Sequence, residues 1–502
     1  MFFRKERVQV ICDELLKLSK VQSIEITDWK IKKGTYNTIE EVDNAKKPWS
    51  DFDSKIDQWT GKDEHYWFRT TITVPDSFDE KPLYFIFKTQ IDEWDDAKNP
   101  QFLLFVNGEI VQGLDMNHRE VLITKEARAK DKYTIDLQAY TGILHSNFLL
   151  IGEMAQIDEK LTKLYYDIQV PLWVIETLEK DDKTRIELEL ALEETINLLD
   201  LREPYSPEFY TSVDEAIEHI KKAVYEDLAG YDDVIATCVG HTHIDVAWWW
   251  TVAQTREKVA RSFATVLKLM DEYPDYIFMS SQPQLYKFLK LRYPEMYEEV
   301  KERIREGRWE AEGGMWLEAD CNVTSGESLV RQFLHGKKFF KDEFGVDSTI
   351  LWLPDVFGYS AALPQIMKKS GIKYFMTTKI SWNQFNKLPY DTFFWRGIDG
   401  TEIFTHLITT KGVDQDKDSF FTTYNGMLHP SALSGGWDRY QQKDLNNDIL
   451  IAYGYGDGGG GTTRAMIETG RRMQKGIKGA PKVRFETSRT YFDELYERCS
   501  KD

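Results

Sequence analysis

The sequence predicts an α/β protein with a β-rich front and a rear part of alternating strands and helices. Short aromatic and β-branched runs separated by turn residues fill residues 1–170, and an acidic segment with helical spacing occupies residues 171–231. Over residues 232–502, continuous apolar runs alternate with charged helical patterns, which is typical of a parallel α/β barrel or open sheet. We therefore expect a β-sandwich-like domain, a helical linker and an α/β barrel domain.

The β-rich front is predicted from three short strands. Residues 66–75 alternate for most of their length and end at a proline, which cannot donate to a strand ladder. Residues 83–87 and 102–106 follow, and the turn pair Asn107-Gly108 ends the second of them. Short strands separated by turn residues are typical of a β-sandwich.

The acidic segment that follows favours helices. Residues 185–199 combine leucine and glutamate densely, and residues 213–228 carry apolar residues at helical spacing. We expect both to be helices that bridge the two domains.

The rear part begins with a buried parallel strand. Residues 234–239 form a continuous apolar run, which is expected of a strand covered on both faces. Strand and helix patterns then alternate along the chain. The expected strands are residues 276–280, 309–315, 348–353 and 374–378, and the expected helices are residues 255–272, 285–306, 327–344, 362–370 and 491–499.

Composition excludes several classes of protein. The 502 residues include 64 Lys and Arg against 83 Asp and Glu, a formal charge of −19, which argues against binding to a nucleic acid backbone. No run of about 18 uncharged apolar residues occurs, so we expect no membrane span. The start lacks the apolar core of a signal peptide and the four cysteines lie far apart, so we expect a cytoplasmic location. Aromatic residues make up 14%, an excess that sugar faces or a large core would both explain.

The most informative motif follows the first strand of the rear part. His241, His243 and Asp245 are spaced two apart, so in an extended chain they share one face at the carboxyl end of a strand. Imidazole and carboxylate groups together suit zinc or a similar divalent ion. Three tryptophans, residues 248–250, follow directly. The alternative is a pair of histidines that caps the strand and hydrogen-bonds locally.

An aspartate and a glycine-rich loop mark two further strand ends. Asp355 stands after an apolar strand that ends in a proline, and its alternative role is an N-cap of the next helix. Asp457 lies within residues 453–462, whose glycines fit the letters GxGxxG of a phosphate loop. No Gly-Lys-Ser/Thr follows, and the aspartate would repel a pyrophosphate. We therefore favour the floor of a sugar site, with a flexible turn as the alternative.

At these three segments the chain resembles the α-mannosidases of glycoside hydrolase family 38, in the branch of bacterial and cytosolic class II type enzymes. Further segments that resemble the family are residues 310–322, 325–332, 377–383, 395–400 and His406. The resemblance extends from about Asp232 to Thr463 and, more loosely, over the β-rich front.

The resemblance implies a seven-stranded parallel (β/α) barrel and a retaining, exo-acting α-mannosidase. Such an enzyme hydrolyses terminal α-linked mannose from an oligosaccharide or a mannosyl conjugate. It uses one divalent metal ion, zinc in the first place, with cobalt or calcium as alternatives. By their places in the motifs, His243, Asp245 and Asp355 are the implied metal ligands. Asp355 is also the implied nucleophile, and Asp457 corresponds to the general acid/base.

The resemblance also implies the sugar-binding groups. Trp248 would stack on the sugar face, and the matching segments place Trp316, Lys379 and Trp382 among the groups expected to contact substrate. His241 is expected beside the metal ligands rather than among them, despite its spacing.

One departure from the family concerns a downstream histidine. In this branch a further zinc ligand lies in a Gln-Phe-His-Asp-like motif, and no such motif occurs here. The histidines after Asp355 are His406 and His429, and neither precedes an aspartate. We expect the chain to be the front part of a larger enzyme, without the family's rear domains. A separate C-terminal fragment is the expected partner, and a homo-oligomer is expected at full length.

Two alternatives from other classes stay open at this point. A non-catalytic carbohydrate-binding remnant would lack the last metal ligand and keep the aromatic residues. A metal-dependent sugar deacetylase also uses histidine and aspartate at barrel strand ends, although residues 248–250 and the glycine-rich loop argue against it. Neither nucleic acid nor a membrane is expected as a partner.

Overall fold

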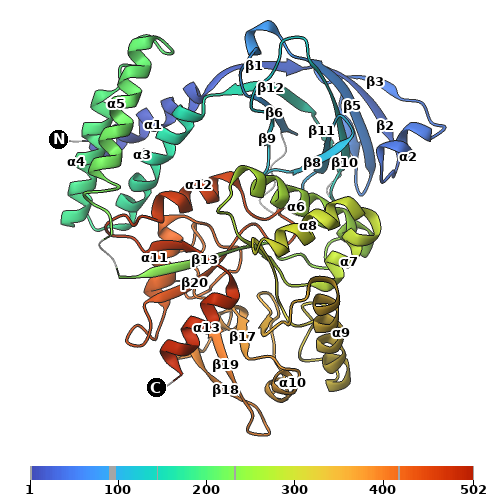
Figure 1. Ribbon diagram of the computed structural model, residues 1–502, viewed down its shortest axis with the longest axis vertical. Coiled ribbons are helices and arrows are strands. Elements are labelled where there is room, and N and C mark those ends of the chain that lie inside the picture. The colour runs from blue at the N-terminus through green and yellow to red at the C-terminus, as the bar shows by residue number, and fades with distance from the viewer. Residues whose placement is uncertain (1–2, 90–97, 144, 231–232, 417–418, 501–502) are drawn as a thin grey trace.

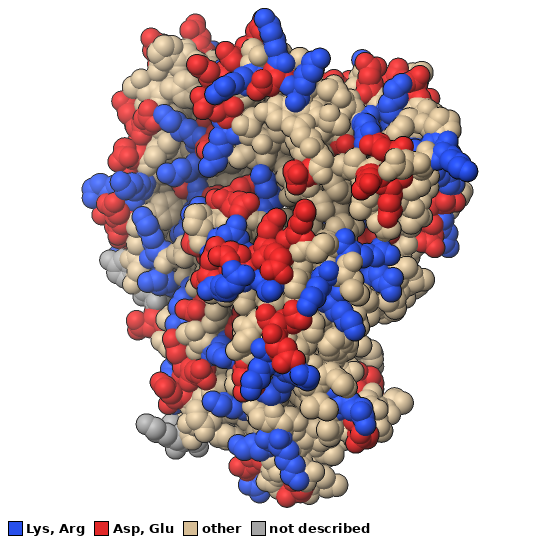
Figure 2. Space-filling model, turned by 45° about the vertical axis from the view of Figure 1, so that its right-hand side comes forward, with Lys and Arg blue, Asp and Glu red and all other residues tan. Residues whose placement is uncertain are grey.

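The computed structural model describes residues 3–89, 98–143, 145–230, 233–416 and 419–500. Figure 1 shows three regions: a β-rich front in blue to cyan, a group of helices that combines the blue α1 with cyan to green helices, and an α/β region from green to red. On the face drawn in Figure 2, basic and acidic side chains are interspersed. None of the described helices combines the length and apolar character needed to cross a bilayer.

The front region contains two antiparallel sheets that share one hydrophobic core. The first sheet has the order β1-β12-β6-β9 and the second the order β3-β2-β5-β10-β7-β8. Their strands are β1 (Lys20–Ile26), β2 (Asp28–Lys33), β3 (Ser50–Asp53), β5 (His65–Thr73), β6 (Leu83–Lys88), β7 (Gln101–Val106), β8 (Glu109–Leu114), β9 (Glu120–Thr124), β10 (Lys132–Tyr140) and β12 (Ile151–Ile157). The three predicted strands are β5, β6 and β7.

Aromatic side chains fill the core between these sheets. The ring of Trp59, on the short strand β4 (Trp59–Gly61) that pairs with β11 (Ser146–Phe148), lies 5.4 Å from Phe68 and 4.9 Å from Phe148. Edge-on aromatic pairs at this spacing add to the free energy gained by burial. Much of the aromatic excess in the sequence is therefore core packing.

The helical region is larger than the sequence analysis expected. It contains α1 (Arg4–Ser19), α3 (Glu159–Thr177), α4 (Lys183–Leu198) and α5 (Pro207–Ala223), while the short α2 (Ile39–Asn44) lies at the front sheets. The chain thus begins with a helix, and α3 runs through the expected boundary at residue 170. Asp158, Asp182 and Ser206 start α3, α4 and α5 by accepting hydrogen bonds from backbone N–H groups.

The α/β region contains two sheets of mainly parallel strands. One has the order β15-β14-β13-β20, with β21 also on β13, and the other has the order β16-β17-β19-β18, in which β18 is antiparallel. The strands are β13 (Ile235–His241), β14 (Phe278–Ser280), β15 (Trp309–Ala311), β16 (Ile350–Trp352), β17 (Tyr374–Thr377), β18 (Thr392–Arg396), β19 (Glu402–Leu407), β20 (Asp448–Tyr453) and β21 (Lys482–Phe485).

Single backbone hydrogen bonds link the two sheets where the described strand ladders stop. Trp352 N, at the end of β16, donates to Gly313 O after β15 at 3.4 Å. On the other side, Thr423 N donates to Thr410 O at 3.0 Å, and Gly426 N donates to Ala452 O of β20 at 3.1 Å. The segment around residues 423–426 therefore lies between the continuation of β19 and β20.

Helices alternate with these strands along the chain. They are α6 (Val252–Glu272), α7 (Pro283–Arg292), α8 (Pro294–Arg305), α9 (Gly326–Phe344), α10 (Leu363–Lys369), α11 (Pro430–Arg439), α12 (Arg464–Met473) and α13 (Ser488–Cys499). The prediction of one helix over residues 285–306 is wrong, because Tyr293 before Pro294 has an extended φ of −134° and separates α7 from α8. Strand β8 of the front region lies against α6, where Gly113 N donates to Thr265 Oγ1 at 3.2 Å.

Candidate active site

Four side chains meet beyond the carboxyl ends of three parallel strands. His243 and Asp245 follow β13, Asp355 follows β16, and Asp457 follows β20. One ligand atom of each lies within 4.8 Å of one ligand atom of every other. The carboxyl ends of parallel strands are where α/β folds place binding and catalytic groups.

His243 is the centre of this group. Its side chain is only 5% exposed, and its Nε2 lies 3.4 Å from Asp245 Oδ1, 3.6 Å from Asp355 Oδ2 and 3.8 Å from Asp457 Oδ1. In the described part of the chain, this Nε2 is buried without a hydrogen-bond partner. One imidazole nitrogen facing three carboxylates is a donor set that fits a divalent metal ion.

The other ring nitrogen of His243 faces a residue that sequence reasoning did not identify. Glu318, after β15, places Oε2 2.7 Å from His243 Nδ1. Burial by itself would lower the pKa of His243, but the carboxylates of Glu318 and Asp245 outweigh it and raise that pKa well above its ordinary value. The carboxylates therefore favour positive charge here, whether it comes from a proton or from a metal ion.

Glu318 is itself held by the end of a neighbouring strand. Ser281 Oγ, after β14, donates to Glu318 Oε1 at 2.6 Å, and Glu318 N donates to Gln282 Oε1 at 3.3 Å. A carboxylate behind a histidine fixes the orientation of the ring and the nitrogen that is left for a metal. Glu318 lies in a segment that resembles the family, but nothing in its spacing connects it to His243.

Asp355 divides its two oxygens between a cation and the centre of the site. Lys379 Nζ, just after β17, lies 2.6 Å from Asp355 Oδ1, while Oδ2 faces His243. The same ammonium lies 4.3 Å from the ring centre of Trp382. Trp382 Nε1 donates to Thr422 O at 2.9 Å, and the residue as a whole is 55% exposed. Lys379 therefore connects the buried acid to an exposed aromatic face.

Asp457 has an unusual backbone conformation, and two neighbours hold its carboxylate. Its φ is +53°, a value that residues other than glycine rarely adopt and that is found at strained functional positions. Tyr424 OH donates to Asp457 Oδ1 at 2.8 Å, and Asn425 Nδ2 donates to Asp457 Oδ2 at 3.2 Å. Burial raises the pKa of Asp457. Tyr424 and Asn425 were not predicted, because they lie in a segment without a motif.

A glycine beside Asp457 lets three segments meet. A side chain on Gly456 would overlap Asn425 Oδ1 and would lie 3.2 Å from the Cβ of His243. The loop therefore needs glycine at this position to approach the metal-binding candidates, and its role as the floor of a sugar site stays a prediction.

The three tryptophans after Asp245 differ in exposure. Trp250 is buried and donates through Nε1 to Asp245 O at 3.2 Å. Trp248 and Trp249 are 52% and 53% exposed, and the Trp248 ring lies 5.7 Å from that of Trp250. Trp248 thus presents an exposed aromatic ring three residues after Asp245.

Trp316 is placed differently from the other predicted sugar-binding residues. Its Nε1 donates to Gln284 Oε1 of α7 at 3.1 Å, and its ring lies 5.6 Å from Phe339 of α9. It lines an opening of about 460 Å³ between these helices, together with Lys287 and His335. None of its contacts in the described part of the chain is with the four clustered side chains.

The remaining histidines of interest lie outside the cluster. His241 Nε2 lies 2.7 Å from Tyr424 O, and burial lowers the pKa of His241 to about 4, so this ring is a neutral donor. His406 is buried against Tyr491, and His429 starts α11. His243 is therefore the one histidine of the four-residue group.

Comparison with known proteins decides the family. The model of the glycosyl hydrolases family 38 N-terminal domain matches residues 233–502. The chain belongs to glycosyl hydrolase family 38. The matched range includes all four clustered side chains.

The curated relatives are named as α-mannosidases. Alpha-mannosidase G of Dictyostelium discoideum is 32% identical over 470 residues, which is 89% of this chain and 41% of the relative. Alpha-mannosidase 2C1 of Homo sapiens is 30% identical over 86% of this chain and 40% of its own length. The alpha-mannosidase of Saccharomyces cerevisiae is 42% identical over 47% of this chain and 21% of its own length. The chain spans about two fifths of the first two relatives.

Proposed function

We propose that this chain carries the catalytic region of a retaining, exo-acting α-mannosidase. The observation that supports the proposal most strongly is the meeting of His243, Asp245, Asp355 and Asp457 within 4.8 Å at the ends of parallel strands. The relatives are named alpha-mannosidases, which supports α-mannosides as the substrate class, and the proposed substrate is terminal α-linked mannose on an oligosaccharide or mannosyl conjugate.

The metal ion belongs to this proposal. His243 Nε2, Asp245 and Asp355 would hold one divalent ion, with zinc as first choice and cobalt or calcium as alternatives. When bound, such an ion supplies positive charge that orients sugar hydroxyls and stabilises charge in the transition state. Lys379 and Glu318 orient Asp355 and His243 from outside the ligand group.

The two acids divide the bond-breaking steps between them. Asp355 attacks the anomeric carbon and forms a mannosyl ester, while Asp457 donates its proton to the departing glycosidic oxygen. Asp457 then takes a proton from the water that hydrolyses the ester, which restores both groups. At least one pair of their oxygens lies within 4.8 Å, so the two carboxyl groups are near enough to act on the same glycosidic bond, as the retaining mechanism requires. Burial of Asp457 favours its protonated form, as the first step requires.

The proposed sugar contacts near the acids come from two segments. Trp248 offers an exposed face for stacking, Lys379 pairs with Asp355, and Trp382 packs against Lys379. Trp316 stays a prediction for substrate binding, because its described contacts lie between α7 and α9.

The architecture expected from the sequence also enters as a proposal. We propose that the seven parallel strands β13, β14, β15, β16, β17, β19 and β20 form one barrel, supported by the hydrogen bonds that link the two sheets. We keep the division at residues 170 and 231, the β-sandwich front, the cytoplasmic location, the C-terminal partner fragment and the homo-oligomer as predictions.

Hydrolysis of an aryl α-mannoside tests the function. Chelated protein should be inactive and should regain turnover with zinc, and NMR should show α-mannose as the first product. Asp355→Asn should abolish turnover, with Asp320→Asn, an exposed acid beyond β15, as the matched control. A 2-fluoro-mannosyl fluoride should leave a covalent adduct on the peptide that contains Asp355.

The alternatives predict different outcomes of the same assay. Calorimetric binding of mannose without metal dependence or product would favour the carbohydrate-binding alternative. Release of acetate from acetylated sugars would favour the deacetylase. Inverted product, or full turnover by Asp355→Asn, would overturn the proposed mechanism.

A further inference from the structure

The loop that carries Asp457 contacts the front region as well as the α/β region. We define the Asp457 loop as residues 456–462. Gln101 Nε2, on β7, donates to Gly458 O at 3.2 Å, and Asn117 Nδ2, between β8 and β9, donates to Gly459 O at 3.2 Å. His118 Nε2 lies 2.9 Å from Thr462 O. Three side chains of the front region thus bind three successive parts of this loop.

The glycine at the centre of the loop is required by this approach. Gly460 has a φ of +88°, and a Cβ there would overlap Asp115 Oδ2 and lie 2.8 Å from His118 Nδ1. Part of the glycine run is therefore explained by the front region and not by a ligand in the site. No feature of the sequence indicated this contact, because the partners are far apart along the chain.

The hydrogen-bond partners of His118 determine its charge. Its Nδ1 lies 2.9 Å from Asp115 Oδ1, and its Nε2 lies 2.9 Å from Thr462 O. Both oxygens are acceptors, so both ring nitrogens must donate and the ring must be an imidazolium. The residue is only 3% exposed, and the Asp115 carboxylate compensates its buried charge. Arg464 on α12 is the other charged group that acts on this ring.

Gln101 has its orientation fixed from the opposite side. Its Oε1 accepts from Lys258 Nζ at 2.9 Å and from Arg261 Nη2 at 2.7 Å, both on α6. With the oxygen bound to two cations, the amide nitrogen must face Gly458 O. The side chain therefore connects β7, α6 and the Asp457 loop.

We propose that His118, together with Asp115, Gln101 and Asn117, is a set of positioning residues through which the front region holds the Asp457 loop. Its effect on the acid/base step rests on the proposed function, whereas the effect on loop order does not. The front region is then part of the catalytic unit. It acts on Asp457 through hydrogen bonds to the backbone oxygens of the Asp457 loop.

Hydrogen exchange tests the proposal without any substrate. Gly459 N donates to Gly456 O, and Gly461 N and Tyr455 O pair within the loop, so their amides report on its order. His118→Ala should speed exchange of this peptide by about tenfold or more, because charge-assisted hydrogen bonds are lost. His118→Gln keeps one donor for Thr462 O and should restore part of the protection.

A matched histidine provides the control. His219 lies on α5 in the helical region. Its Nδ1 forms a hydrogen bond of 2.9 Å with Thr195 Oγ1, and its Nε2 lies 3.5 Å from Glu194 Oε2. His219→Ala should leave exchange of the Asp457 loop unchanged. Unchanged exchange in His118→Ala, or an equal increase in both alanine variants, would overturn the proposal.

Kinetics then test the link to the acid. With active enzyme, His118→Ala should lower kcat for mannosides with poor leaving groups more than for those with good ones, at unchanged KM, since only poor leaving groups need the proton. Equal loss for both leaving groups would contradict the positioning of Asp457. If the wild-type chain hydrolyses no mannoside, the proposed function fails, and the exchange experiment still decides the loop contact.

Discussion

At the residue scale, the chemistry of the site depends on which face a side chain takes where a strand ends. The spacing of His243 and Asp245 predicted a shared face, and the two lie together. His241 has the same spacing but is still within β13 and points to Tyr424 O instead. The two-residue spacing therefore correctly groups the side chains that follow the end of β13, but it does not group them with His241, which is still within the strand. Glu318 and Tyr424 could not be predicted, because their partners come from other parts of the chain.

Removal of the Glu318 charge should weaken metal binding. Glu318→Gln should lower zinc affinity by about 10- to 100-fold, because the carboxylate that orients His243 is lost. Calorimetric titration of chelated protein measures the affinity. Glu327→Gln, an exposed change in the first turn of α9, is the control and should bind zinc like the wild type. Unchanged affinity in Glu318→Gln would contradict this role.

Asp457 has a role that substitution can separate from metal binding. Asp457→Asn should keep zinc affinity within a few-fold of the wild type. It should lose turnover by about 100-fold or more on poor leaving groups, because proton donation is lost. If zinc affinity falls together with turnover on all leaving groups, Asp457 is a metal ligand and not the acid.

At the element scale, strands and amphipathic helices were predictable where local pattern decides. β5, β7 and α9 follow the expected runs closely. α1 was not predicted, although Val8, Cys12 and Leu15 recur at helical spacing, because the whole of residues 1–170 was interpreted as β-rich. The split of α7 from α8 depends on a single proline.

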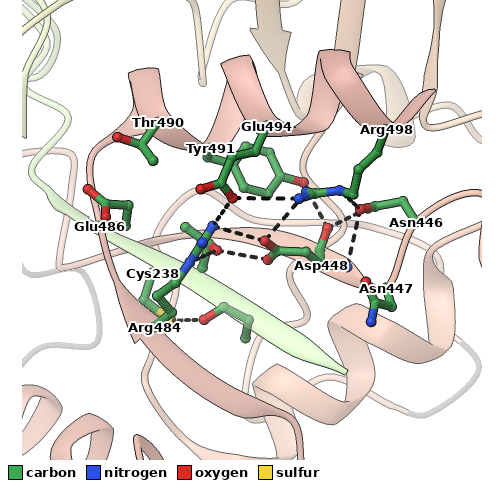
Figure 3. Close-up of polar contacts among 12 residues, drawn as sticks. Cys238, Asn446, Asn447, Asp448, Arg484, Glu486, Thr490, Tyr491, Glu494 and Arg498 are labelled. Carbon is green, nitrogen blue, oxygen red and sulfur yellow. Dashed lines mark hydrogen bonds and ion pairs between the residues drawn. The ribbon is translucent and has the colours of Figure 1, made fainter. Parts of the chain in front are cut away.

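The last helix is tied to the sheet by a buried polar network (Figure 3). Asp448 at the start of β20 accepts from Thr237 Oγ1 at 2.8 Å and pairs with Arg484 at 3.0 Å. From α13, Tyr491 OH donates to Asp448 O at 3.0 Å, and Arg498 Nη2 lies 3.5 Å from the Asp448 carboxylate. The network joins β13, β20, β21 and α13. Asp448 lies at the amino end of β20, opposite to the end that leads to Asp457.

Loss of Asp448 should therefore destabilise this end of the sheet. Asp448→Ala leaves the buried Thr237 hydroxyl without its acceptor, while Arg484 keeps Glu494 as a partner, so the change should cost about 1–3 kcal/mol. Urea unfolding and hydrogen exchange of α13 measure the effect. Glu497→Ala on the exposed face of the same helix should change stability by less than about 0.5 kcal/mol. Equal stability of the two variants would show that the network contributes nothing.

At the scale of the whole molecule, the front region and the α/β region meet at the Asp457 loop and along α6. The sequence predicted both regions but not that contact, since it depends on side chains brought together only by folding. The division into separate domains therefore follows the sequence pattern, but it does not account for the contacts that the front region makes with the loop carrying Asp457.

The stability of the whole chain should depend on pH through His406. Burial and the charge of Arg498 lower the pKa of His406 to about 3, so the unfolded chain binds a proton below about 6.5 that the folded chain does not. Stability should fall as pH drops from about 6.5 toward 3, by up to about 1.4 kcal/mol per pH unit from this group. His406→Gln should flatten the curve, measured by urea unfolding at several pH values. Parallel curves for both proteins would contradict this.

The most direct test of the metal-centred account is anomalous diffraction at the zinc edge from crystals of the zinc-loaded protein. The account predicts one peak at about 2.0–2.2 Å from His243 Nε2 and from oxygens of Asp245 and Asp355. A protein that binds zinc elsewhere, or shows no peak among these three side chains, would contradict it.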